Sequence, residues 1–294
     1  MTNDQWPSAG VHIQLASVPS WGWWLIWFIG GSCLGSFLNV CIYRMPREQS
    51  VVRPRSRCPH CEHPIAWCDN IPVVSFVILR GACRQCRRPI RWRYPIVESL
   101  TGLSTVAVFH RFGVWPLGLV YLAFVCGLIV SSFIDLEFQI IPDEISLGGL
   151  VLGLLLSVAL PVLHGTDSRW LALGRSVTGL LVGGGLLYGT GLVGDFLFKK
   201  ESMGGGDIKL LAMAGSLLGW KLVVLTFFLA PLLAVIPGLA VLVFKRSHVI
   251  PYGPFLSLAL VVSLFVGHEI IQRSGVEETV RLLWMFYGPQ GSIR

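Results

Sequence analysis

The sequence at positions 203–211 reads Met203-Gly204-Gly205-Gly206-Asp207-Ile208-Lys209-Leu210-Leu211. Three glycines precede an aspartate that stands at the start of an apolar run. An earlier apolar run ends in the same manner, at Phe133-Ile134-Asp135. Carboxylates at the edge of membrane segments are costly and are usually functional. We therefore treat Asp135 and Asp207 as a pair of acids at similar membrane depths.

The composition predicts an all-α polytopic membrane protein. Of 294 residues, 53% are hydrophobic and only 13% are charged. Several apolar stretches approach the length that spans a bilayer. They predict about eight transmembrane helices, at 21–43, 96–110, 114–134, 145–164, 171–195, 206–219, 221–244 and 252–272.

The net charge of +7 is unevenly distributed. Eleven arginines lie between Arg44 and Arg93, whereas residues 1–43 contain no lysine or arginine. The positive-inside rule therefore places this arginine-rich segment in the cytoplasm and the N-terminus outside. Arginines beside a membrane set orientation and contact anionic lipid, so we expect membrane lipid as a partner and no nucleic acid. The start of the chain has Asp4 and no basic region, which favours a retained anchor over a cleaved signal.

These patterns divide the chain into four parts. We predict an N-terminal segment with the first transmembrane helix (1–43), a cytoplasmic domain (44–95), a transmembrane catalytic domain (96–272) and a short tail (273–294) to which we assign no function.

The cytoplasmic domain contains two C-x2-C pairs, Cys58-Pro59-His60-Cys61 and Cys83-Arg84-Gln85-Cys86. Two such pairs are typical of a zinc-ribbon-like site with four thiolate ligands. Two disulfides are the alternative, which a reducing cytoplasm disfavours. Four thiolates leave no open position, so we expect zinc to be structural and to fold the short segment between the pairs. We interpret the other four cysteines as small apolar packing residues: Cys33, Cys41, Cys68 and Cys126.

Three further polar residues have both a structural and a functional interpretation. Asn39, within the first apolar run, either bonds a neighbouring helix or faces the catalytic cavity. Glu98 is either a helix N-terminal acid favoured by the dipole or a functional residue. Asp143 follows a proline and precedes an apolar run, so we predict a helix N-cap. Glu137 and Glu144 are expected to face water.

Two glycine patterns bear on helix packing. Small residues recur around Gly31 and Gly35, which predicts a close approach of two helices. Residues 189–194 match G-x-G-x-x-G, but this string lies in an apolar helix without the strand that a dinucleotide site requires. We predict instead that Gly185 and Gly189 form a G-x-x-x-G packing face.

Two acids in one membrane site predict aspartic-protease chemistry. Carboxylates that share a site do not both ionise easily, so one activates water while the other donates a proton. Gly204 and Gly206 would let an extended substrate backbone approach. The helix N-terminus favours Asp207 as the charged member, with Asp135 protonated.

The chain resembles the type IV prepilin peptidases, a family of G-x-G-D intramembrane aspartyl proteases, over nearly its whole length. The matching stretches are Gly35-Ser36-Phe37-Leu38-Asn39-Val40, Tyr43-Arg44, both C-x2-C pairs, Asn70-Ile71-Pro72-Val73, Arg93-Tyr94-Pro95, Val97-Glu98, Phe133-Ile134-Asp135, Pro142-Asp143, Gly206-Asp207-Ile208-Lys209-Leu210-Leu211-Ala212 and Pro251-Tyr252-Gly253-Pro254-Phe255. A small departure is Cys68, where the family commonly has an aromatic residue.

The resemblance implies a bifunctional enzyme of the bacterial inner membrane with a cytoplasmic catalytic face. Such an enzyme cleaves the basic leader from prepilins or type II secretion pseudopilins. It then methylates the new N-terminus with S-adenosylmethionine. Asp135 and Asp207 match the catalytic acids, and Lys209 belongs to the same motif and shapes the site. The implied methylation site is the cytoplasmic segment and the adjoining end of the first transmembrane helix, with Glu98 a candidate residue.

Other interpretations remain open at this stage. Presenilin-like proteases share G-x-G-D but have a tyrosine where this chain has Ile134, and their Pro-Ala-Leu element is absent. A transporter using both acids as an ion relay leaves the four cysteines unexplained. A peptidase without methyltransferase activity, or a docking domain beside purely structural acids, is also compatible. The sequence gives no indication of an oligomeric state.

Overall fold

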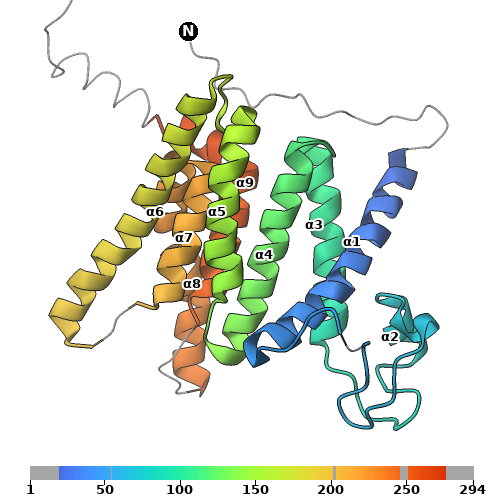
Figure 1. The fold of residues 1–294 in the computed structure, drawn as a ribbon. Coiled ribbons are helices and arrows are strands. Elements are labelled where there is room, and N and C mark those ends of the chain that lie inside the picture. The colour runs from blue at the N-terminus through green and yellow to red at the C-terminus, as the bar shows by residue number, and fades with distance from the viewer. Residues whose placement is uncertain (1–19, 54, 201–202, 246–250, 276–294) are drawn as a thin grey trace, which may run out of the picture.

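The computed structural model describes residues 20–53, 55–200, 203–245 and 251–275. These residues form a bundle of eight long helices without extended strands (Figure 1). The helices are α1 (Ser20–Arg44), α3 (Arg93–Phe112), α4 (Leu117–Phe138), α5 (Asp143–Ala159), α6 (Arg169–Phe198), α7 (Gly205–Leu218), α8 (Trp220–Lys245) and α9 (Gly253–Arg273). Each coincides with one predicted apolar segment, so the all-α prediction is confirmed. The predicted outer N-terminus before residue 20 and the tail after residue 275 lie outside the described residues.

Four of these helices are long and apolar enough to cross a membrane: α1, α4, α6 and α9. Helices α3, α5 and α7 are shorter or less apolar, and α8 is apolar over Trp220–Val235, where the description of its side chains largely ends. The shortest is α7, whose 14 residues span only about 21 Å at 1.5 Å per residue. Within the described residues, length and composition therefore give four candidate membrane spans, where the apolar runs predict eight.

Helix α4 joins the two sides of the bundle. It packs against α1 and α3 on one side and against α5 and α9 on the other. Its apolar surface is buried along most of its length, with Tyr121, Leu128 and Ile134 at most 1% exposed. This burial holds the C-terminal end of α4, which carries Asp135, in the interior of the bundle.

The predicted close approach at the first helix is confirmed. At Gly35 a side chain would lie 2.7 Å from the Cα atom of Glu98, and at Gly31 it would overlap Thr105. Only glycine lets α1 and α3 approach so closely.

The predicted packing face at Gly185 and Gly189 is wrong, because nothing lies within 4 Å of a side chain at either position. The close contact uses earlier glycines of the same helix. Gly179 of α6 lies against the backbone carbonyl of Gly215 of α7, and a side chain at Gly183 would lie 2.5 Å from the carbonyl oxygen of Leu211. The contact is set by where α7 crosses α6.

The segment between α1 and α3 forms a small lobe at one end of the bundle (Figure 1). It contains two 3-10 turns, η1 (Met45–Arg47) and η2 (Trp67–Asn70), and the short helix α2 (Val74–Ile78). It has little apolar interior: its aromatic contact joins Phe76 to the exposed Trp92, with ring centroids 5.1 Å apart. Such a lobe needs a further stabilising element.

The prediction that the four remaining cysteines pack in the interior is correct for two of them. Cys41 and Cys126 are buried, whereas Cys33 and Cys68 are exposed. Cys33 lies on the outer surface of α1, where hydropathy does not distinguish contact with lipid from contact with protein.

Candidate active site and metal centre

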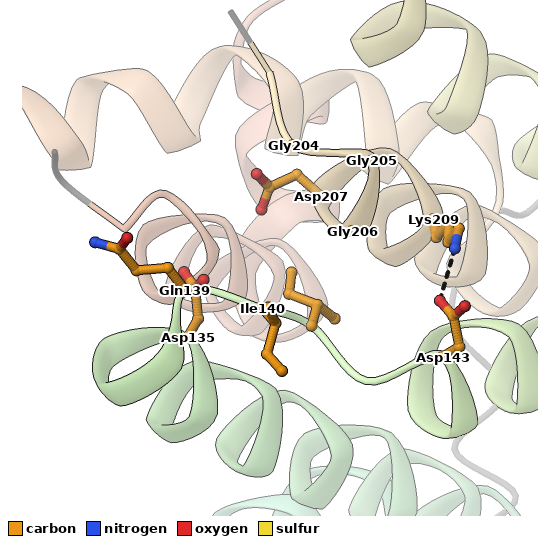
Figure 2. A pocket seen from close by; sticks show the side chains of 10 residues that line it. Asp135, Gln139, Ile140, Asp143, Gly204, Gly205, Gly206, Asp207 and Lys209 are labelled. Carbon is orange, nitrogen blue, oxygen red and sulfur yellow. Dashed lines mark hydrogen bonds and ion pairs between the residues drawn. The ribbon is translucent and has the colours of Figure 1, made fainter. Parts of the chain in front are cut away.

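The structure brings Asp135 and Asp207 to one cavity of about 310 Å³. Asp135 lies in the last turn of α4, and Asp207 is the third residue of α7 (Figure 2). The remaining lining residues are Gln139, Ile140, Ile141, Asp143, Gly204, Gly205, Gly206 and Lys209. Two acids separated by 71 residues in sequence thus face a common space large enough for water and a peptide group.

Asp135 has a backbone partner that sequence reasoning did not identify. The N–H of Gly253, the first residue of α9, donates to Oδ2 of Asp135 at 3.0 Å. A side chain at Gly253 would lie 2.7 Å from the same oxygen. The glycine therefore supplies a donor and leaves space for the carboxylate. The signal in the sequence is the turn-rich stretch Pro251-Tyr252-Gly253-Pro254.

Lys209 closes one side of the cavity. Its Nζ lies 2.7 Å from Oδ1 of Asp143, which connects α7 to α5 (Figure 2). Asp143 is the first residue of α5, and Pro142 is the N-cap, so the predicted N-cap role of Asp143 is wrong. Both charged side chains are substantially exposed, so this pair contributes little stability.

The three glycines before Asp207 differ in their surroundings. A side chain at Gly206 would lie 2.9 Å from Cβ of Ile141, so this glycine lets the start of α7 pack against the α4–α5 connection. Gly205 has open space around it, and Gly204 is the N-cap of α7. Gly205 is thus the position least restricted by the protein itself.

An ion pair connects the end of α4 to the start of α3. Arg93 is 9% exposed, and its Nη1 donates to Oε1 of Glu137 at 2.7 Å. Arg91 adds a second charge 3.8 Å from the same oxygen. Glu137 was expected to face water only, but it also binds these arginines. Because Glu137 is two residues after Asp135, the arginine-rich segment and the acids share one end of the bundle.

Asn39 and Glu98 do not line the cavity. Asn39 donates from Nδ2 to the carbonyl oxygen of Tyr94 at 3.1 Å, which joins α1 to the start of α3. Glu98 accepts the N–H of Val73 on Oε2 at 2.7 Å, which joins α3 to the segment before α2. Both contacts support the structural interpretation of these residues.

The four cysteines of the two C-x2-C pairs converge. The Sγ atoms of Cys58, Cys61, Cys83 and Cys86 all lie within 4.8 Å of one another. Tetrahedral zinc with Zn–S bonds of about 2.3 Å requires S–S distances of about 3.8 Å. The Cys58 and Cys86 sulfurs are 3.8 Å apart, which fits a shared ion and is much too long for a disulfide. The residues present therefore fit zinc.

The two cysteine turns have the same backbone hydrogen bonds. Cys58 N–H donates to the His63 carbonyl, and Cys83 N–H donates to the Arg88 carbonyl. The residue after each pair, Glu62 or Arg87, has a φ of 55° or 57°. This repetition points two thiols from each turn toward one centre.

Comparisons with known proteins cover both halves of the chain. Residues 29–112 match the bacterial peptidase A24 N-terminal domain, and residues 122–239 match the type IV leader peptidase family. The prepilin leader peptidase/N-methyltransferase of Aeromonas hydrophila is 35% identical over 289 residues, covering 88% of this chain and 96% of that protein. That of Pseudomonas aeruginosa is 33% identical, with 82% and 89% covered.

The Myxococcus xanthus protein of the same name is 41% identical over 216 residues, which cover 73% of this chain and 62% of that protein. No solved structure is significantly similar to the chain.

The cysteine cluster generates a test of metal binding. We predict that the purified protein contains about one zinc per chain, because four thiolates fill one tetrahedral shell. Cys58→Ser is expected to lose the metal, measured by atomic emission on the purified protein. Cys68→Ser is the matched control, since this exposed cysteine lies in the same lobe outside the cluster. A metal-free protein, or equal loss in both variants, would contradict the assignment.

Proposed function

Because the chain belongs to the type IV leader peptidase family, we propose that it cleaves the leader peptide of type IV prepilins or type II secretion pseudopilins. The observation that supports this most strongly is the single cavity lined by Asp135 and Asp207. The relatives named as prepilin leader peptidases align over most of their length with this chain.

The proposed reaction uses the two carboxyl groups in complementary states. The ionised member removes a proton from water, and the water oxygen attacks the scissile carbonyl carbon. The protonated member donates to the carbonyl oxygen as the tetrahedral gem-diol intermediate forms, so the two acids have exchanged states at this point. The acid that took the proton from water then donates it to the leaving amine nitrogen as the C–N bond breaks. The other carboxylate takes back the proton of the gem-diol hydroxyl as the product carboxyl group forms, which restores the starting states. Gly253 N–H orients one oxygen of Asp135 throughout.

The residues around the acids have proposed supporting roles. Gly204 and the open Gly205 offer a path along which substrate backbone reaches Asp207. Gly206 shapes the site by packing on Ile141. The Lys209–Asp143 pair sets the spacing of α7 and α5 at the cavity edge.

We propose that all eight long helices cross the bacterial inner membrane, with α7 shielded from lipid by its neighbours. The arginine-rich lobe then lies in the cytoplasm under the positive-inside rule. Since Arg93 binds Glu137, the cavity opens on the same side. A prepilin leader with basic residues would approach it from the cytoplasm.

We also propose N-methylation of the new N-terminus, because the relatives are named as N-methyltransferases. S-adenosylmethionine would supply an electrophilic methyl group. A carboxylate suits its cationic sulfonium, and Glu98 is a buried acid in the N-terminal half. Its Oε2, however, already accepts the Val73 N–H, so we route no transfer step through this residue. Zinc, held by four thiolates, would fold the lobe.

Removing either catalytic carboxylate should abolish cleavage. We predict that Asp135→Asn and Asp207→Asn each lose at least about 10³-fold in cleavage of a purified prepilin, since neither asparagine activates water or donates an acid proton. Asp195→Asn, an acid at the end of α6 that does not line the cavity, is the control. Near-normal cleavage by either variant would exclude the two-aspartate mechanism.

Gly253 generates a second prediction. In Gly253→Ala the new methyl group meets Oδ2 of Asp135 and displaces the carboxylate. A misplacement of about 1 Å in a catalytic group costs about 10²-fold in rate, so we expect kcat to fall by this order while KM changes little. Gly189→Ala, which has open space, should retain full activity. Equal rates for both variants would contradict the role of Gly253.

Leader cleavage and methyl transfer should depend on different residues of the protein. With a synthetic substrate that already carries the processed N-terminus, Asp207→Asn is expected to retain methyl transfer from labelled S-adenosylmethionine, because no peptide bond needs to break. Cys58→Ser should lose transfer as the lobe unfolds. Absence of label with the wild-type protein would leave a peptidase without methyltransferase activity.

A further inference from the structure

The lobe between α1 and α3 exposes an apolar face on α2. Val74, Val77 and Ile78 are 50%, 68% and 69% exposed, and their i, i+3, i+4 spacing places them on one side of the helix. Phe76 lies on the opposite side of α2 and contacts Trp92, whose side chain is 70% exposed. We call Val74, Val77 and Ile78 the α2 face.

One hydrogen bond fixes the position of the segment before α2 along the axis of α3. The N–H of Val73, the residue before α2, donates to Glu98 at 2.7 Å. Glu98 is five residues after the start of α3, which corresponds to about 7.5 Å along the helix axis. The segment that leads into α2 therefore lies beside the first turns of α3, and Phe76 of α2 contacts Trp92, the residue before α3. Helix α2 thus lies at the level where α3 begins (Figure 1). Interfacial helices lie at such a boundary between the membrane and water.

The charge of the lobe complements an anionic membrane surface. Residues 44–95 contain eleven arginines, three acids and no lysine, a net charge of +8. Arg80 lies two residues after the end of α2 and is exposed. A tryptophan beside a short apolar helix and flanking arginines is the arrangement found where proteins enter the headgroup region.

We propose that the α2 face inserts into the cytoplasmic leaflet and attaches the lobe to anionic lipid. A second copy of the chain is a poorer occupant, because the three side chains of the α2 face bury far less than the roughly 1,000 Å² that a specific interface needs. The attachment holds the lobe close to Arg93 and thus to the α4 end that carries Asp135. This inference does not depend on the cleaved substrate.

The test uses the full-length protein in vesicles of phosphatidylglycerol and phosphatidylethanolamine. A diazirine amino acid is incorporated in place of Val77, and the adducts formed on irradiation are identified by mass spectrometry. The control carries the same amino acid in place of Glu62, which is exposed in the first cysteine turn. We expect lipid adducts at position 77 and no lipid adducts at position 62.

A second experiment tests whether the attachment requires anionic lipid. In vesicles of phosphatidylcholine alone, the yield of lipid adduct at position 77 should fall, because the arginines of the lobe are attracted to an anionic surface and not to a zwitterionic one. Adducts at position 77 that contain water only, or a second protein chain, would overturn the proposal. So would equal lipid adducts at both positions.

Discussion

The burial of α7 is the constraint on which the active site depends. Every residue from Leu210 to Leu218 is buried, and the helix packs against α5, α6, α8 and α9. The glycine contact between Gly179 and Gly215 brings α6 and α7 to backbone distance. Asp207 lies on the first turn of this enclosed helix, so the packing of α7 determines where its carboxylate stands. A membrane bundle gains this precision from close van der Waals contact, since lipid offers no hydrophobic drive between helices.

The second acid is positioned by different means. Asp135 comes from α4, the helix that joins both sides of the bundle, and is oriented by a backbone N–H from α9. The Arg93–Glu137 pair attaches the same end of α4 to the lobe that carries the four-cysteine cluster. A buried arginine is stable only when paired, so this link is specific. The two halves of the chain that match separate family models are thus physically connected two residues from Asp135.

Sequence patterns predicted the helices, the two acids and the four clustered cysteines, because each depends on local composition or fixed spacing. They did not predict contacts that depend on helix rotation. The G-x-x-x-G string at Gly185 was assigned to packing although Gly179 makes the contact, since spacing does not reveal which face meets a neighbour. The hydrogen bond from the Gly253 N–H to Asp135 was not predicted, because almost every residue has a backbone N–H and the sequence does not mark which one binds a carboxylate. Asp143 was taken for a cap, whereas its partner Lys209 lies 66 residues away.

The length of α7 affects how deeply the scissile bond of a substrate must enter the membrane. A helix of about 21 Å is roughly 9 Å shorter than the hydrocarbon core of a typical bilayer. If its far end reaches the opposite boundary, Asp207 stands below the headgroups and inside the thickness of the membrane. The scissile bond must then be drawn inward, and the peptide around it must leave its helical hydrogen bonds to reach the acids. The mismatch between the length of α7 and the thickness of the membrane would therefore favour substrates whose helix unwinds at the membrane boundary.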